Sequence, residues 1–100
     1  MSLYYVQKLL YLINREPHTR KRLDTDFDVL VSEYDLTTEE ISALREVDVG
    51  MLYIMGVNGQ ILMHYAAHRG YEWNDYIATL RRALKEHGLV RAGLYATIWD

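Results

Sequence analysis

The chain contains no cysteine and only one proline among its 100 residues. Without thiols it can form no disulfide, no thiolate metal site and no cysteine nucleophile, a composition that is compatible with the cytoplasm. No apolar run reaches the length needed to span a bilayer. The net charge of -3 gives no reason to expect nucleic acid or an anionic membrane as a partner. We therefore expect a soluble cytoplasmic protein.

The sequence also lacks the motifs by which self-sufficient enzymes are commonly recognised. It has no G-x-S-x-G nucleophile elbow, no phosphate-cradling glycine loop and no pair of carboxylates in a plausible cleft. The segment 56–59, Gly-Val-Asn-Gly, resembles a phosphate loop only in composition. A helix stop, a turn and a new helix cap explain it more simply. On its residues alone the chain is a binding or scaffolding module, and no catalytic residue is assigned in it.

Helical periodicity is the main pattern that the sequence does contain. Hydrophobic residues make up 50% of the chain and charged residues 25%, as in a globular domain. Their spacing predicts amphipathic helices at 3–13, 23–34 and from Trp73 to Gly88. Pro17 either ends the first helix or begins the next. The basic run 15–22 lacks interleaved aromatic residues and adjoins a strongly acidic stretch, so it indicates a solvated helix start.

Three short capped helices in tandem are predicted in the centre of the chain. Each has a side chain that can cap its first turn, and two end at a glycine that tolerates a left-handed backbone. In chain order these signals are the capping box Thr37 with Glu40, then Asp48 with Gly56, then Asn58 with Gly70. The sequence therefore predicts an all-α fold, a compact single domain of five to six short helices with an irregular C-terminal tail.

Tyrosine is the aromatic residue in excess, with nine against one phenylalanine and two tryptophans. Its ring suits both the edge of a small core and a protein interface, and both readings stay open. We expect an N-terminal amphipathic helix at 1–16, a helical core at 18–87 and a tail at 88–100. The tail's aromatic residues are costly to leave in water, so it should dock on this domain or on a partner. The candidates for a partner interface are Tyr4, Tyr5, Tyr11, Tyr95 and Trp99.

Two groups of residues could in principle bind a metal ion. The four carboxylates at 24–33 could attract a hard cation, but the glycine of a calcium loop is missing. His64 and His68 share a helix face at a spacing that can bind zinc, but the glutamate of H-E-x-x-H is missing. The sequence indicates no third ligand, although Glu72 or Asp75 could fold back. Because solvent-facing or hydrogen-bonded histidines are the more common finding, no metal site is predicted in this chain.

The central stretch resembles a known family. The residues that carry the resemblance are Tyr34 at a helix end, Leu36-Thr37-Thr38-Glu39-Glu40, Ala43-Leu44, Asp48, Leu52 and the turn Gly56-Val57-Asn58. Over residues 23–84 this pattern is similar to the small (alpha) subunit of two-subunit extradiol ring-cleavage dioxygenases. Protocatechuate 4,5-dioxygenase is the type member of these enzymes. Relatives often carry His-Pro where this chain has Asn58-Gly59.

The resemblance implies a non-catalytic subunit. In this family the large subunit carries the non-haem Fe(II), with its histidine and carboxylate ligands, and also the catalytic base. The all-helical small subunit wraps the large one and helps to close the active site over an aromatic substrate, here a catechol or an aminophenol. A complex of two small and two large chains would follow the family. The candidates for the face nearest the active site are Asn58, His64, Tyr65 and His68.

Two other functions stay open on the sequence. Domains that resemble this fold occur in some modified-peptide precursors, where the segment 89–100 would be presented to a modifying enzyme. The chain could also be a small helical protein whose partner is not an enzyme. A mass change confined to the tail would indicate a precursor, whereas a dioxygenase subunit should show none.

Overall fold

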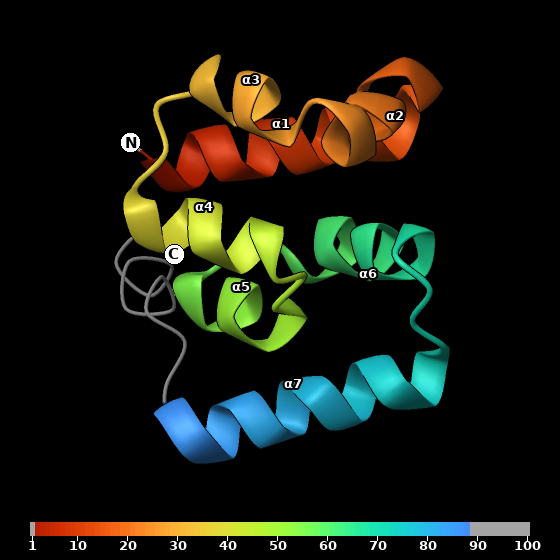
Figure 1. The fold of residues 1–100 in the computed structure, drawn as a ribbon. Coiled ribbons are helices and arrows are strands. Elements are labelled where there is room, and N and C mark those ends of the chain that lie inside the picture. Colours follow the sequence, from red (N-terminus) through yellow and green to blue (C-terminus); the bar gives the residue numbers. More distant parts are fainter. Residues whose placement is uncertain (1, 89–100) are drawn as a thin grey trace.

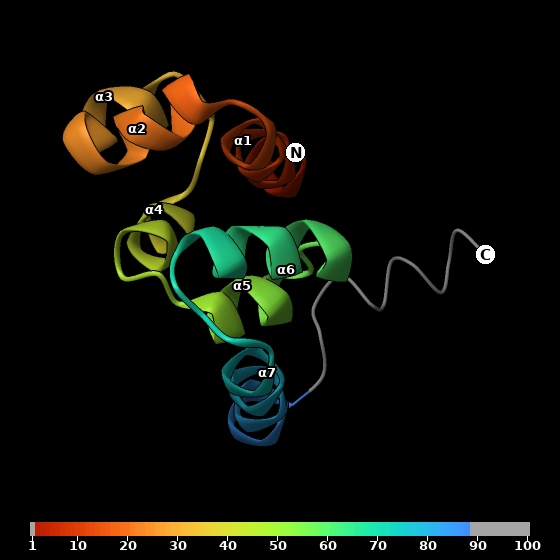
Figure 2. The same ribbon diagram turned by 90° about the vertical axis from the view of Figure 1, so that its right-hand side faces the viewer.

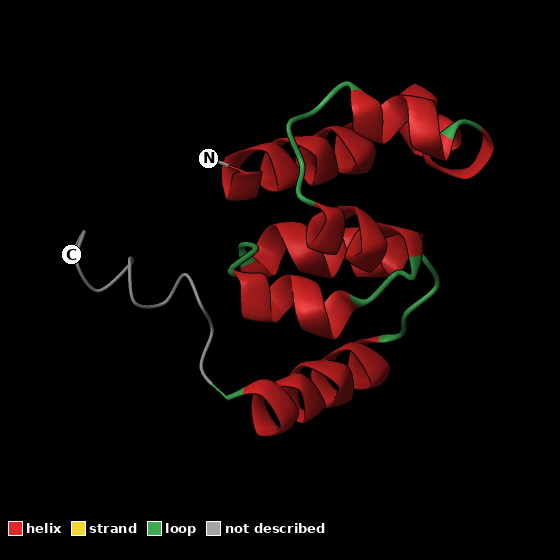
Figure 3. Ribbon diagram, turned by 60° about the vertical axis from the view of Figure 1, so that its left-hand side comes forward, coloured by secondary structure: helices red, strands yellow, loops and turns green. Residues whose placement is uncertain are grey.

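The computed structural model describes residues 2–88, which are organised in seven α-helices and no β-strand (Figures 1 and 3). In chain order these are α1 (Ser2–Arg15), α2 (Pro17–Thr25), α3 (Phe27–Ser32), α4 (Thr38–Arg45), α5 (Val49–Met55), α6 (Gly59–His68) and α7 (Trp73–His87). The predicted all-α class is confirmed. The expectations for the tail, including Tyr95 and Trp99, lie outside the described residues.

The helices are stacked in layers. Figure 1 shows α1 with α2 and α3 at one end of the molecule, α4, α5 and α6 in the middle, and α7 at the other end. Because α5 packs against α7 and α6 packs against α1, these two short helices join the ends. The stack measures 34 × 31 × 22 Å. None of the helices in residues 2–88 combines the length and the apolar character needed to cross a bilayer.

The predicted helix caps form as the sequence indicates. The hydroxyl of Thr37 accepts from the Glu40 N–H at 3.1 Å, and the Glu40 carboxylate accepts from the Thr37 N–H at 2.7 Å. Asp48 accepts from a backbone N–H at the start of α5, and Asn58 accepts from two at the start of α6. Gly56 ends α5 with φ of 108°. Since each cap contributes about 1 kcal/mol, local chemistry defines where these short helices begin and end.

One predicted helix is in fact two. The apolar spacing predicts a single helix over 23–34, whereas the chain leaves helical geometry at Asp26, with φ of -134° and ψ of 46°. The helix α2 therefore ends there and α3 begins in a new direction. An ion pair between Arg22 and Glu33, 2.5 Å long, joins the two helices across the break. This break brings the described chain to seven helices where five to six were predicted.

The core lies between the layers and draws on α1, α3, α4, α5 and α6 together. Its most completely buried large side chains are Val6, Leu9, Leu10, Ile13, Leu30, Leu44, Val49, Leu52, Ile54, Leu62 and Tyr65. The apolar stripe predicted for α1 is among them. Because no single helix here could bury its own apolar face, packing between layers supplies most of the stabilisation of each short helix.

The face by which α7 packs differs in part from the predicted one. The spacing of Ile77, Leu80 and Leu84 predicts the apolar stripe of this helix, with Trp73 and Ala83 at its flanks. In the structure Ile77 and Leu80 are partly buried, Leu84 is exposed, and Ala83 is buried in its place. The reason is that α5 presents Gly50 at the crossing, so the small Ala83 side chain approaches more closely than a leucine could.

Candidate functional site

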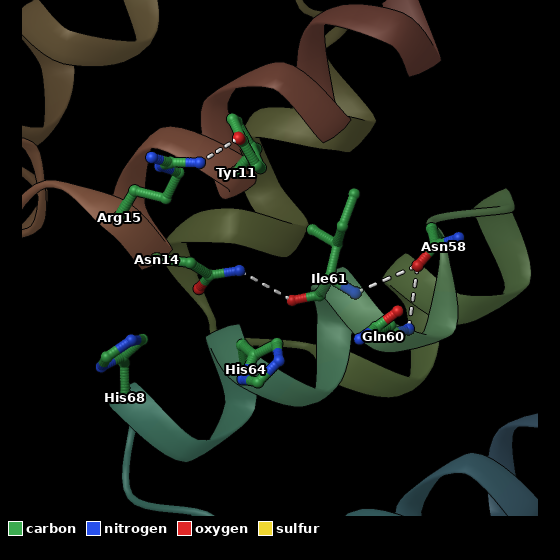
Figure 4. Close-up of a pocket in the computed structure, with 8 residues that line it drawn as sticks. All are labelled: Tyr11, Asn14, Arg15, Asn58, Gln60, Ile61, His64 and His68. Carbon is green, nitrogen blue, oxygen red and sulfur yellow. Dashed lines mark hydrogen bonds between the residues drawn. The ribbon is translucent and has the colours of Figure 1, made fainter.

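A surface cleft of about 550 Å³ lies between α1 and α6 (Figure 4). The described residues that line it are Tyr11, Asn14, Arg15, Asn58, Gln60, Ile61, His64 and His68. Three of the four residues predicted to face the active site, namely Asn58, His64 and His68, are brought together here. They share the cleft because positions 61, 64 and 68 follow one face of α6, and Asn58 caps its start.

Two hydrogen bonds from side chains of α1 position α6. The Asn14 Nδ2 donates to the carbonyl oxygen of Ile61 at 3.0 Å, and the Gln7 Oε1 accepts from the Asn58 N–H at 2.7 Å. Figure 4 shows the Asn14 bond spanning the space between α1 and α6. Both bonds end on the backbone of α6, so they hold the helix itself and leave its outer side chains free to meet a ligand.

The side-chain oxygen of Asn58 is used to cap α6, whereas its amide nitrogen is not. Its Oδ1 accepts from the N–H groups of Gln60 and Ile61, at 2.9 and 3.1 Å, and these bonds cap α6. Only the amide NH₂ of Asn58 is then left for a ligand or partner, and this group can only donate. Asn58 in the cleft is therefore a hydrogen-bond donor.

Arg15 and Tyr11 form the α1 wall of the cleft. The Arg15 guanidinium carbon lies 5.2 Å from the centre of the Tyr11 ring, and its Nη1 donates to the Tyr11 hydroxyl. Both side chains are exposed. The ring holds the guanidinium in place by a cation–π interaction, so the cleft presents a positioned positive charge at its edge.

His68 is tied to Arg20 on α2, which also bonds the end of α1. The Arg20 Nη1 lies 3.2 Å from the His68 Nε2, and it also donates to the carbonyl oxygens of Ile13 and Asn14 at 3.0 and 3.2 Å. A guanidinium can only donate, so the Nε2 is the acceptor and a neutral His68 carries its proton on Nδ1. Burial lowers the pKa of His68 and the neighbouring Arg20 charge lowers it further, while a backbone hydrogen bond with Asn14 acts in the opposite direction.

Substitution of Arg20 by glutamine is expected to raise the pKa of His68, because it removes a positive charge that opposes protonation. NMR titration of the imidazole proton would measure it. Lys21→Gln removes an equally positive charge one residue along the helix and serves as the control. An equal rise in both variants would contradict a specific Arg20–His68 contact.

The same shift has a consequence for stability. Because the pKa of His68 is lowered in the folded state, the unfolded chain takes up the proton first as the pH falls. The contribution of His68 to stability is therefore present above the unfolded value of about 6.5 and is lost as the pH falls through the folded pKa.

Tyr65 does not share the face of the two histidines. Position 65 is turned by about 100° from position 64, toward Leu62 and Ala66, and the Tyr65 side chain is 0% exposed. Burial raises the pKa of its hydroxyl to about 12. Its OH has no hydrogen-bond partner in the described part of the chain. Tyr65 is thus a core residue beneath the cleft, and its placement on the ligand-facing surface is corrected.

The predicted interface tyrosines lie next to the cleft on α1. Tyr4 is 59% exposed and meets Tyr5 edge to face, with ring centroids 5.3 Å apart, and Tyr11 is also exposed. A second cleft of about 580 Å³ continues from the first along α1. Its described lining residues are Tyr4, Gln7, Lys8, Tyr11, Leu12, Asn58 and Ile61. The two clefts share three of their lining residues, so they form one surface, which we call the α1–α6 groove.

The carboxylates at 24–33 are distributed among separate partners. Three of them pair with different arginines, in the pairs Asp24–Arg69, Asp28–Arg45 and Glu33–Arg22. Within residues 2–88 no three histidine, aspartate or glutamate side chains come together in an arrangement that could hold a metal ion. These acidic residues therefore act as partners of arginine side chains on the protein surface.

Comparison with known protein families identifies the family of the chain. The family described as the LigA subunit of the aromatic-ring-opening dioxygenase LigAB matches residues 6–87. The chain belongs to this family. Comparison with curated proteins and with solved structures gave no significant match. The LigA family is the small-subunit family of protocatechuate 4,5-dioxygenase, so the resemblance seen in the sequence is confirmed.

Membership of the LigA family gives the chain the role of a subunit in a ring-opening dioxygenase and implies a large partner subunit, LigB. The match runs from within α1 to the end of α7 and so includes both helices of the groove. Of the predicted interface residues in the described part, Tyr4 and Tyr5 precede the matched range. The sequence did not indicate the other lining residues of the groove, because no local pattern marks them as site residues. These are Gln7, Lys8, Leu12, Asn14, Arg15, Gln60 and Ile61.

Proposed function

We propose that this chain is the non-catalytic small subunit of a two-subunit extradiol dioxygenase. In this proposal it packs on the large subunit through the α1–α6 groove and helps to close the active site over a catechol or an aminophenol. The LigA-family match over residues 6–87 carries the proposal. The groove supports the choice of face, because it collects hydrogen-bonding side chains beside exposed tyrosine rings. Exclusion of water would be its contribution to catalysis.

In this proposal the non-haem Fe(II) belongs to the large subunit and not to this chain. The two histidines of the groove have no third ligand beside them in residues 2–88. The Arg20 guanidinium that faces His68 would also repel a cation at that ring. The complex is proposed to be cytoplasmic and to contain two small and two large chains, in line with the family.

The groove can supply hydrogen bonds to a ring substrate or to the backbone of the partner. Asn58 offers its amide NH₂ as a donor, and the exposed His64 makes no side-chain hydrogen bond within residues 2–88. His68 is held at its Nε2 by Arg20, so its ring has a defined orientation. These groups can orient a polar aromatic ring without themselves taking part in bond cleavage.

The test is reconstitution of the complex. The chain is affinity-purified from its native host, the co-purifying large subunit is identified by mass spectrometry, and ring opening is assayed with catechol and aminophenol substrates. The assay compares the large subunit alone with the complex. It then compares complexes that carry the double variant His64→Ala/His68→Ala with complexes that carry His18→Ala, an exposed histidine on α2 outside the groove.

We expect the complex to be more active than the large subunit alone, and the double variant to lose turnover or substrate preference while assembly is retained. Unchanged kinetics in the double variant would remove these histidines from the active-site face. Recovery of no iron-bearing partner would contradict the proposed function itself. A modifying enzyme in its place, with a mass change confined to residues 89–100, would indicate a modified-peptide precursor.

A further inference from the structure

One exposed stripe of α1 alternates aromatic rings with positive charges. Tyr4, Lys8, Tyr11 and Arg15 follow one another at helical spacings of four, three and four residues, so they share a face. All four are exposed, and all four line the α1–α6 groove. Tyrosine and arginine are enriched where protein surfaces meet, which singles this stripe out from an ordinary solvated face.

The groove carries positive charge on a protein that is acidic as a whole. The chain has 14 aspartate and glutamate residues against 11 lysine and arginine. Even so, none of the described residues that line either cleft of the groove is an aspartate or a glutamate. Neither Lys8 nor Arg15 has an ion-pair partner among residues 2–88. Glu16, the carboxylate next to Arg15, instead accepts a hydrogen bond from Thr19.

The acidic residues are concentrated elsewhere. Nine of them lie between Asp24 and Asp48, a range that covers the end of α2, all of α3 and all of α4. Figure 2 shows these three helices on one side of the molecule, with α1 toward the other. The Debye length at physiological salt is about 8 Å, which is short against a body of 34 × 31 × 22 Å. The electrostatic attraction that a partner meets at the groove is therefore set by the nearby positive charges of Lys8 and Arg15, and the distant acidic residues are screened.

We infer that the α1–α6 groove docks a carboxylate-bearing segment of the large subunit. This inference rests on the proposed function and adds the chemistry of the partner surface. Charge complementarity selects carboxylates, because Lys8 and Arg15 have no acidic partner among residues 2–88, and His64 and Asn58 add hydrogen-bond donors nearby. The tyrosine rings between the cations supply apolar contact area.

The geometry indicates how the carboxylates should be spaced. Lys8 and Arg15 are two helical turns apart, which is about 10 Å along α1. An extended segment rises about 3.3 Å per residue and turns every second side chain to the same face. Two acidic residues at i and i+2 or at i and i+4, about 7 or 13 Å apart, would therefore both face α1, within reach of the long lysine and arginine side chains. The two adjoining volumes, about 550 and 580 Å³, extend along the same helix and suit a peptide segment better than one small anion.

Charge reversal tests the inference in the complete complex. The large subunit purified from the native host is titrated with wild-type chain, with Lys8→Glu/Arg15→Glu and with Arg81→Glu/Lys85→Glu. The last pair changes the net charge equally on an exposed part of α7 outside the groove. We expect the groove variant to raise the Kd at least about tenfold, and we expect added salt to weaken binding of the wild-type chain but to strengthen binding of this variant, because salt screens the new repulsion. The α7 variant should stay near wild type. The variant Lys8→Arg/Arg15→Lys keeps both positive charges and should bind the large subunit about as tightly as the wild-type chain.

Carbodiimide cross-linking tests the same contact without a substitution, because it joins a lysine amine to a carboxylate that touches it. We expect Lys8 of the wild-type chain to be linked to an aspartate or glutamate of the large subunit. Links from Lys21 or Lys85 but none from Lys8 would overturn the inference, as would links between two copies of this chain at Lys8. Circular dichroism of each variant confirms that the helices are intact.

Failure of the proposed function and failure of this inference give different results. If the wild-type chain forms no complex with a ring-opening protein, the proposed function is wrong and the inference falls with it. If the complex forms and opens rings, but the groove and α7 variants bind equally, the inference alone is wrong.

Discussion

Replacement of Leu52 by alanine is expected to destabilise the domain by about 2–5 kcal/mol. Leu52 is 0% exposed and lies in α5, the helix that packs against α4, α6 and α7. A helix of seven residues has little stability of its own, so α5 depends on the core that Leu52 fills. The truncation removes apolar contact and leaves a cavity at the junction of the layers.

Thermal or urea unfolding of the purified chain, followed by circular dichroism, would measure this effect. Each kcal/mol corresponds to about 4–8 °C in Tm for a domain of this size. Val29→Ala on α3 is the control, because Val29 is 56% exposed and its truncation should change the stability by no more than about 0.5 kcal/mol. Equal effects in the two variants would mean that α5 does not occupy the core.

The second large effect is expected at the crossing of α5 and α7. A Cβ added at Gly50 would lie 2.9 Å from the Ala83 Cβ and 3.4 Å from the Thr79 carbonyl oxygen. Neither atom belongs to a flexible side chain, so the two helices would have to move apart. Such overpacking costs about 1–3 kcal/mol, which exceeds the gain of up to about 1 kcal/mol from replacing glycine by alanine in a helix. Gly50→Ala should therefore destabilise the protein.

Gly59→Ala is the matched comparison. Gly59 begins α6, and nothing lies within 4 Å of its added Cβ, so the same substitution should be neutral or stabilising. Opposite signs for the two glycines are the expected result, read from denaturant unfolding. Ala83→Gly combined with Gly50→Ala should cost less than the sum of the two single changes, because it removes the atom that clashes. If the free-energy changes of the two substitutions were strictly additive, Gly50 and Ala83 would not be in contact at the crossing of α5 and α7.

The limits of sequence reasoning are clear at three positions. The apolar period runs through Asp26 without interruption, so it could not reveal that the backbone breaks there between α2 and α3. Tyr65 follows His64 in sequence but faces the core, since the direction in which α6 packs selects its buried side. Asn14 reaches the groove through a bond to a residue 47 positions away, which no local pattern marks.

Both predicted site histidines and Asn58 meet in one cleft, and the reason is local. A cap at Asn58 and helical spacing from 61 to 68 are properties of consecutive residues, so the sequence alone predicts that they share one end and one face of α6. The opposite wall of the groove comes from α1, and its residues could be assigned only when the packing of α1 against α6 was known.

The sequence by itself determined the all-α class, the start and end of the capped helices, the apolar stripe of α1 and the family to which the chain belongs. These depend on interactions between residues a few positions apart, such as the reciprocal bonds of Thr37 and Glu40. The tertiary structure alone decided the close crossing at Gly50, the burial of Tyr65 and the joining of α1 and α6 into one positively charged groove. These depend on contacts between distant segments, and such contacts form only when the layers pack their apolar faces together.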